Sequence, residues 1–202
     1  MLTRISLALL VGALLLQITA CGSSSDPNPQ NLTQAQSQQL ASEGFTEIAI
    51  ATIDGLRSLE TSCTSSPCTL SYTYECADGG SIAVAGSLTV SKSGGTDSAS
   101  GTVNVTPSKC SDGTLVINGN PDVTVTSQVS DNGTTSTGTF TAQGNVGFSP
   151  VTSGQFPTGT CGVSNLMVSG SATDSTGDVT CTISGSICGQ TVSTSCPSGV
   201  HL

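Results

Sequence analysis

The chain has 202 residues, with 13 acidic and four basic side chains and a formal net charge of −9 at pH 7. Beyond the first 20 residues the basic side chains are Arg57, Lys92 and Lys109. These scattered cations are too few to replace phosphate counterions or to attract an anionic membrane surface. We therefore exclude nucleic acid as a partner.

Ser and Thr together account for 63 residues, whereas aromatic residues make up only 3% of the chain. Composition of this kind is compatible with disorder. Here, however, the hydroxyl residues alternate with Val, Ile and Leu, and cysteines recur along the chain. The pattern therefore predicts a β domain with a hydroxyl-rich outer face.

Residues 1–20 have the pattern of a secretory signal peptide. Arg4 and the amino terminus give a positive start, and the apolar run LALLVGALLLQI covers residues 7–18. This run is too short for a transmembrane helix, which requires roughly 20 residues. Small residues follow it, as they do at a signal cleavage site. The alternative is an uncleaved anchor helix, but no stop-transfer pattern follows the run.

The segment Ile18-Thr19-Ala20-Cys21 resembles the lipobox of bacterial lipoprotein precursors, and the resemblance covers only this amino-terminal part. It implies cleavage before Cys21 and attachment of acyl chains to that residue, so that the protein is exported and held at the cell envelope. In that family an Asp after the Cys retains the protein in the inner membrane. Gly22 therefore implies the outer membrane. Two or three acyl chains on one Cys make a lasting anchor, whereas one chain binds reversibly.

Residues 21–32 are predicted to form a polar, proline-containing tether, and residues 33–202 a single domain. The domain should begin with a helix over residues 34–60. Thr33 and Gln36 match a capping box, and apolar residues then recur every three or four positions. Glycine lowers helix stability, so a bend is expected near Gly44. The apolar stripe should pack on a sheet; the alternative is a lid over an apolar cavity.

From Cys68 onward the hydrophobic period changes to two. Eight or nine short strands are separated by tight turns, and Asp131-Asn132-Gly133 has the sequence of a hairpin turn. Because no long crossover separates the strands, we predict an antiparallel meander. The fold class is therefore mainly β: a strongly curved sheet or partly open barrel, with one amino-terminal helix packed on its concave face. A β-sandwich is the alternative.

The chain has nine cysteines. If Cys21 carries lipid, an even number remains, and in an exported protein such a set predicts disulfides. No CxxC pair supports a zinc site. The sequence does not determine the connectivity, but proximity along the chain favours Cys63–Cys68, Cys76–Cys110, Cys161–Cys181 and Cys188–Cys196.

The sequence contains no recognisable catalytic or cofactor motif. A serine hydrolase needs a base beside its nucleophile, and the single histidine, His201, lies next to the end of the chain. Most acidic residues lie in turns, where Asp bonds to the backbone. Asp112, Asp131, Asp174 and Asp178 offer oxygen ligands for calcium, but no DxDxDG-like cluster is present. We therefore expect no enzyme activity, no metal and no cofactor.

Three functional hypotheses remain. The first is a lipid-anchored module with a non-catalytic structural or partner-binding role, its partner an unidentified envelope protein. The alternative is a carrier of an apolar ligand or lipid between helix and sheet. A lipid would need a cavity of several hundred cubic ångströms, which the helix must leave open. An enzyme would need two acids in one cleft, or a Ser beside His201. The candidate lining of the carrier cavity is Phe45, Ile48, Tyr72, Phe140 and Phe148.

Overall fold

A computed structural model describes residues 31–63, 66–93, 96–119, 123–131, 135–152, 156–173 and 178–197. The expected signal peptide and Cys21 lie outside these residues, as do most of the tether, the Asn132-Gly133 turn, Asp174 and His201. In the part of the chain that is described, neither helix combines the length and the apolar character that a bilayer crossing requires.

The amino-terminal segment forms two consecutive helices, α1 (Gln34–Ser42) and α2 (Gly44–Ser62), in place of the single helix predicted. The capping box is confirmed: Gln36 N donates to Thr33 Oγ1 over 3.3 Å, and Thr33 N donates to Gln36 Oε1 over 3.0 Å. The break falls beside Gly44, where a bend was expected. A Cβ atom on Gly44 would lie 2.9 Å from Ile117 Cγ2, so glycine also permits close approach to the sheet.

The strands form one antiparallel sheet in the order β1-β2-β3-β6-β7-β8-β9-β10, with β4 pairing β5 and β5 pairing β7 beside this path. The predicted meander is therefore confirmed, with β1 and β10 at the two edges. A short β4–β5 hairpin interrupts it between β3 and β6. The strand bounds are β1 (Cys68–Glu75), β2 (Ser81–Ser93), β3 (Thr96–Ser108), β4 (Cys110–Ser111), β5 (Leu115–Asn118), β6 (Val123–Asp131), β7 (Thr135–Pro150), β8 (Gly159–Thr173), β9 (Val179–Ile187) and β10 (Gln190–Ser195).

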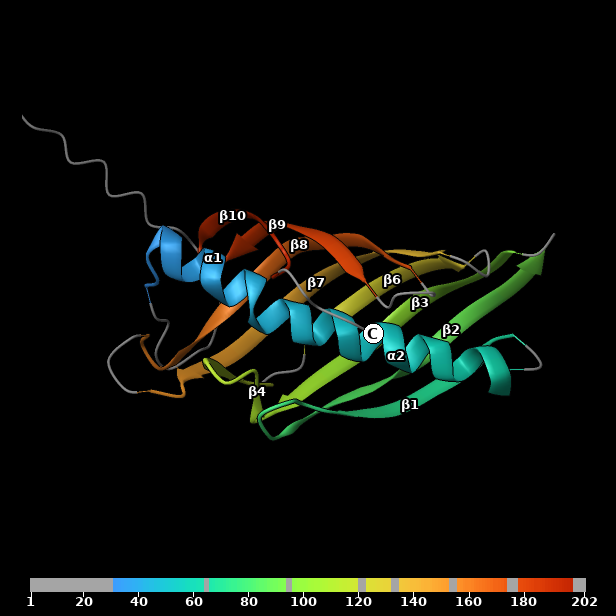
Figure 1. The fold of residues 1–202 in the computed structure, drawn as a ribbon, viewed down its shortest axis with the longest axis horizontal. Coiled ribbons are helices and arrows are strands. Elements are labelled where there is room, and N and C mark those ends of the chain that lie inside the picture. Colours follow the sequence, from blue (N-terminus) through green and yellow to red (C-terminus); the bar gives the residue numbers. More distant parts are fainter. Residues whose placement is uncertain are drawn as a thin grey trace, which may run out of the picture.

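The helices cover the concave face of this curved, open sheet, as Figure 1 shows. Along β2, Ile82, Val84 and Leu88 are buried, while Ala83, Ala85 and Ser87 between them are exposed to solvent. Phe45 and Ile48 of the helices are 1% and 3% exposed against this face. The apolar stripe of the helices therefore fills the hollow of the sheet, because a sheet with one apolar face must bury it against another element.

Four disulfides are present, and two of the four pairings expected from proximity are wrong. Cys63–Cys68 and Cys76–Cys110 are confirmed. In place of Cys161–Cys181 and Cys188–Cys196, the bonds are Cys161–Cys188 and Cys181–Cys196. Disulfides form and persist in oxidising compartments, so these bonds indicate an exported protein.

The register of β8 with β9 explains the correction. These strands are antiparallel, with Val163 opposite Ile187 and Gly170 opposite Cys181. Cys161 therefore lies beside Cys188, far from Cys181 along the strand. On the other side of β9, Ser195 pairs with Thr182, which brings Cys196 beside Cys181.

Candidate functional site

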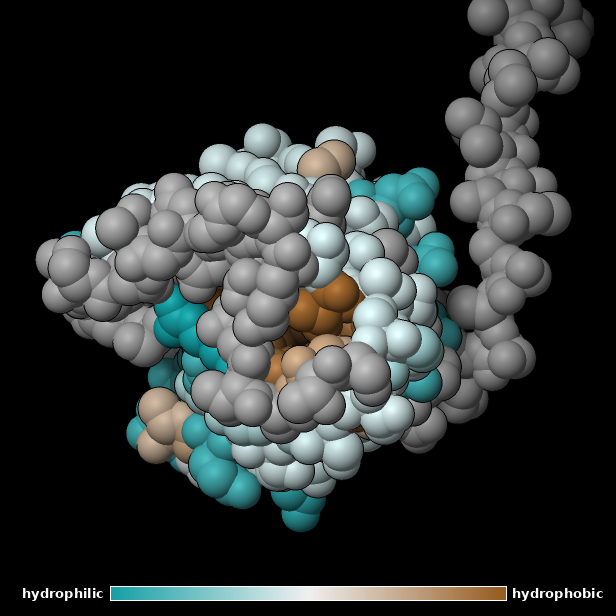
Figure 2. All heavy atoms as spheres, turned by 90° about the vertical axis from the view of Figure 1, so that its right-hand side faces the viewer, coloured by the Kyte–Doolittle hydropathy of each residue, from teal (hydrophilic) through white to brown (hydrophobic). Residues whose placement is uncertain are grey.

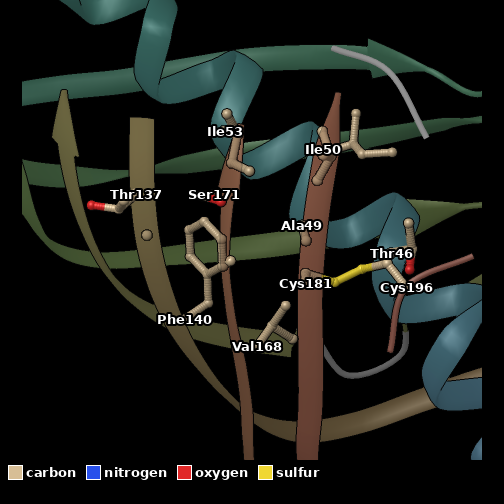
Figure 3. Close-up of a pocket in the computed structure, with 13 residues that line it drawn as sticks. Thr46, Ala49, Ile50, Ile53, Thr137, Phe140, Val168, Ser171, Cys181 and Cys196 are labelled. Carbon is tan, nitrogen blue, oxygen red and sulfur yellow. A yellow bond between two sulfur atoms is a disulfide. The ribbon is translucent and has the colours of Figure 1, made fainter. Parts of the chain in front are cut away.

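An apolar pocket lies where α2 crosses β7, β8 and β9 (Figure 3). We call it the helix–sheet pocket. Ala49, Ile50 and Ile53 of α2 form one wall, and Phe140 and Val168 of the sheet form the opposite wall. The Cys181–Cys196 disulfide also lines it, and three hydroxyl residues contribute as well: Thr46, Thr137 and Ser171.

The hollow exists because two glycines meet in the sheet. Gly138 and Gly170 belong to the set of residues in β7 and β8 that faces the helices, and they are direct register partners. A pair of larger residues at these positions would fill the space. Gly170 is further constrained, since a Cβ atom there would lie 2.5 Å from the carbonyl oxygen of Thr180 on β9.

The pocket is small. Its cavity volume is about 30 Å³, and an adjoining void behind Phe45, Ile48 and Phe140 measures about 10 Å³. A bound lipid would need several hundred cubic ångströms. The helices occupy most of the space that a carrier of a whole lipid would have to leave open.

The candidate lining residues are only partly brought together. Phe45, Ile48 and Phe140 meet around these two cavities, whereas Tyr72 lies against Gly55 of α2 and outside their described linings. Phe148 also lies elsewhere, packed edge-on against Phe156 with ring centroids 5.6 Å apart. Phe156 is buried, with 6% of its surface exposed. It lies in a segment rich in Gly, Pro and Thr, so no hydrophobic periodicity identifies it as a core residue.

A wider groove adjoins the helix–sheet pocket. It has a volume of about 650 Å³ and shares Val179, Cys181 and Cys196 with the pocket. Glu43, at the junction of the two helices, also lines it. From the right-hand end of Figure 1, Figure 2 shows the molecule hollowed, with apolar atoms inside and weakly polar atoms around them.

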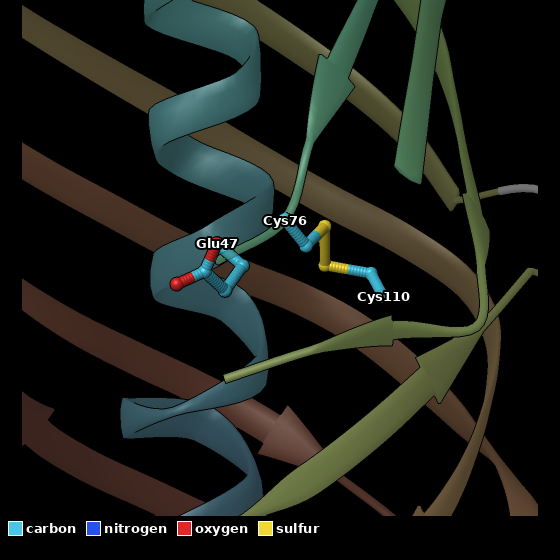
Figure 4. A group of neighbouring side chains, drawn as sticks. All are labelled: Glu47, Cys76 and Cys110. Carbon is cyan, nitrogen blue, oxygen red and sulfur yellow. A yellow bond between two sulfur atoms is a disulfide. The ribbon is translucent and has the colours of Figure 1, made fainter. Parts of the chain in front are cut away.

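Glu47 of α2 lies beside the Cys76–Cys110 disulfide (Figure 4). A carboxylate oxygen of Glu47 and the two sulfur atoms lie within 4.8 Å of one another. Because the sulfurs are bonded to each other, they are not thiolates, and the group offers a metal a single charged ligand. Oε2 of Glu47 is buried and has no hydrogen-bond partner among the described residues.

Burial raises the pKa of the Glu47 carboxyl above its ordinary value, and the nearby charges of Asp112 and Asp78 raise it further. A hydrogen bond from Tyr74 opposes this by favouring the ionised carboxylate. The effect on Tyr74 is complementary: burial, followed by the charge of Glu47, raises the pKa of its phenol to about 12. Glu47 and Tyr74 therefore form a helix-to-sheet contact in which the pKa of each group is raised, chiefly by burial.

Asp112, one of the candidate calcium ligands, has a structural role in its turn. Its Oδ1 accepts hydrogen bonds from Thr114 N and Leu115 N, each over 2.8 Å, and from Thr114 Oγ1 over 2.7 Å. This is the backbone bonding expected of turn acids. The side chain of Asp131 and the whole of Asp174 lie outside the described part of the chain.

The chain matches no protein-family model, no curated protein and no solved structure. Its function must therefore be argued from its own residues.

Proposed function

We propose that the protein is a lipoprotein of the bacterial cell envelope, anchored to the outer membrane by acyl chains on Cys21, with a non-catalytic partner-binding domain. The observation that carries the anchor is the cysteine count. All eight cysteines of residues 33–202 are paired in four disulfides, so Cys21 is the one thiol left over. It stands at the end of a signal-like apolar run, where acylation would consume it.

A partner-binding role fits the domain better than transport of a lipid. The concave face is filled by the chain's own helices, and the helix–sheet pocket measures about 30 Å³. A cavity of that size suits the tip of a single side chain, whereas a drug-sized ligand needs roughly 300 Å³ or more. The adjoining groove is larger, at about 650 Å³, but it is open and its lining is as polar as it is apolar, so it does not provide the enclosed apolar cavity that a whole lipid would need.

Metabolic labelling of a bacterial host with an alkyne-bearing palmitate analogue tests the anchor. The wild-type chain should incorporate the label, sediment with outer membranes, and have the mass of residues 21–202 plus acyl groups. The Cys21→Ser variant should be unlabelled and should lack both the acyl mass and the cleavage before residue 21, whereas the matched Ser23→Ala variant should behave like wild type. A wild-type product that keeps Met1, or whose Cys21 sulfur is unmodified, would contradict the proposal.

A further inference from the structure

We propose that the helix–sheet pocket and its adjoining groove bind an extended segment of a partner protein. The segment inserts one aliphatic side chain between α2 and the sheet, and carries a basic residue opposite Glu43. This inference rests on the proposed partner-binding role and gives it a site.

The groove follows a part of β9 that β10 does not cover. β10 pairs with β9 from Thr182 onward, and the last contact is from Cys196 N to the Cys181 carbonyl oxygen, over 3.1 Å. Pro197 has no N–H group to continue the ladder. Among the described residues, Val179 and Thr180 have strand partners on the β8 side alone. An uncovered strand edge can pair with an extended chain through backbone hydrogen bonds.

The pocket opens beside this edge and supplies a place for one side chain. Val179 and Cys181 belong to the linings of both the pocket and the groove. A chain lying along Val179 would therefore pass the pocket mouth. The surface that lines the pocket is almost entirely apolar, and a buried apolar anchor at the centre of a protein interface can provide much of the affinity.

The charge of the groove indicates the second feature of the partner. Glu43 lines the groove, and its carboxylate accepts a hydrogen bond from the Gln39 amide at 3.2 Å and lies 2.9 Å from the Thr114 hydroxyl, whose single hydrogen is shared with Asp112. These contacts hold the carboxylate in place without neutralising it. The chain as a whole is acidic. A Lys or Arg on the partner segment would be complementary, and such rim charges set association rate and specificity.

The test uses residues 21–202 with the Cys21→Ser substitution, exported behind a signal peptide that is cleaved without acylation, with the four disulfides formed. Random linear eight-residue peptides displayed on phage are selected against it, and the enriched peptides are synthesised with a fluorescent label. The proposal expects enrichment of an aliphatic residue close to Lys or Arg. Addition of such a peptide should shift the methyl NMR signals of Ile50, Ile53 and Val168, which line the pocket.

Two substitutions locate the binding. Ala49→Leu fills the pocket and should weaken peptide binding at least about tenfold, because the anchor side chain is excluded. Ala35→Leu, at an exposed position of α1, is the matched control and should have no effect. Glu43→Gln should weaken binding about threefold, and less at high salt, whereas Glu75→Gln on exposed β1 should not.

Several outcomes would overturn the proposal. One is the absence of enriched peptides; another is peptide binding that leaves the three methyl groups unshifted in the protein without these substitutions. Octanoate that shifts these signals when no peptide does would assign the pocket to an acyl chain instead. Binding seen only after removal of residues 198–202 would show that the chain's own end is the occupant. Acylation of Cys21 is measured separately on wild type, so failure at the groove is distinguishable from failure of the anchor.

Discussion

Removal of the Cys76–Cys110 disulfide should destabilise the domain more than removal of any other disulfide. In the chain-entropy description, a cross-link stabilises by restricting the unfolded chain, and its effect grows with the length of the closed loop. The sequence separations are 34 residues for Cys76–Cys110, 27 for Cys161–Cys188, 15 for Cys181–Cys196 and 5 for Cys63–Cys68.

These separations correspond to about 4, 3.5, 3 and 2 kcal/mol at 25 °C. For a domain of this size, the loss of Cys76–Cys110 should lower Tm by roughly 8–15 °C. Loss of buried contacts should destabilise this variant further, because Cys76 and Cys110 are only 7% and 1% exposed. The assay is thermal and urea unfolding of four paired Cys→Ala variants, each mapped by non-reducing peptide mass analysis.

One of these variants and one further double variant test the connectivity of the carboxyl-terminal cysteines. Cys161→Ala with Cys188→Ala should leave three intact disulfides and no free thiol. Cys161→Ala with Cys181→Ala removes one partner from each of two bonds, so Cys188 and Cys196 should both react with a maleimide after unfolding. The reasoning fails if the first variant has free thiols, or if loss of Cys63–Cys68 destabilises the domain more than loss of Cys76–Cys110.

Three further predictions concern the contact of α2 with β1. Leu70 is 1% exposed, so Leu70→Ala should lower the free energy of unfolding, measured in urea, by about 2–5 kcal/mol. Thr69→Ala, on the exposed face of the same strand, should change it by less than about 0.5 kcal/mol. Similar losses for the two variants would contradict the assigned burial. Because burial raises the folded-state pKa of Glu47 above its ordinary 4.5, the stability contributed by this group is present below that value and is lost as pH rises through the folded pKa. Glu47→Gln should therefore reduce the pH dependence of the free energy of unfolding above pH 4.5. The variant should become more stable relative to wild type as the pH approaches neutral. An unchanged slope of the free energy of unfolding against pH would contradict burial of the Glu47 charge. In a Tyr72→Phe background, the single remaining phenol, Tyr74, should titrate by ultraviolet absorbance with a pKa of about 12, and Glu47→Gln should lower that value; a midpoint near 10 would show an exposed ring.

The sequence predicted those features that depend on neighbours along the chain. The Thr33–Gln36 capping box involves residues three positions apart, and the break at Gly44 follows from the low helix propensity of glycine. Strands were recognisable because alternate residues point to opposite faces. The meander followed from short connections between them.

The candidate site was less predictable, because its parts come from distant segments. Phe45, Ile48 and Phe140 were expected at the helix–sheet boundary and do meet there. The pocket itself requires Gly138 to lie opposite Gly170, a match that depends on the register of β7 with β8. In the sequence, each of these glycines looks like an ordinary interruption of a strand.

By itself, the sequence determined an even set of cysteines beyond Cys21, a capped helix and a hydroxyl-faced meander, because short-range patterns encode each of these; the exported-type leader stays a prediction from the same kind of pattern. The tertiary structure alone decided that Cys161 bonds to Cys188, that the helices fill the sheet, and that an uncovered end of β9 adjoins the pocket. Strand register and helix placement bring together residues that are far apart in the chain, and no local pattern specifies that juxtaposition.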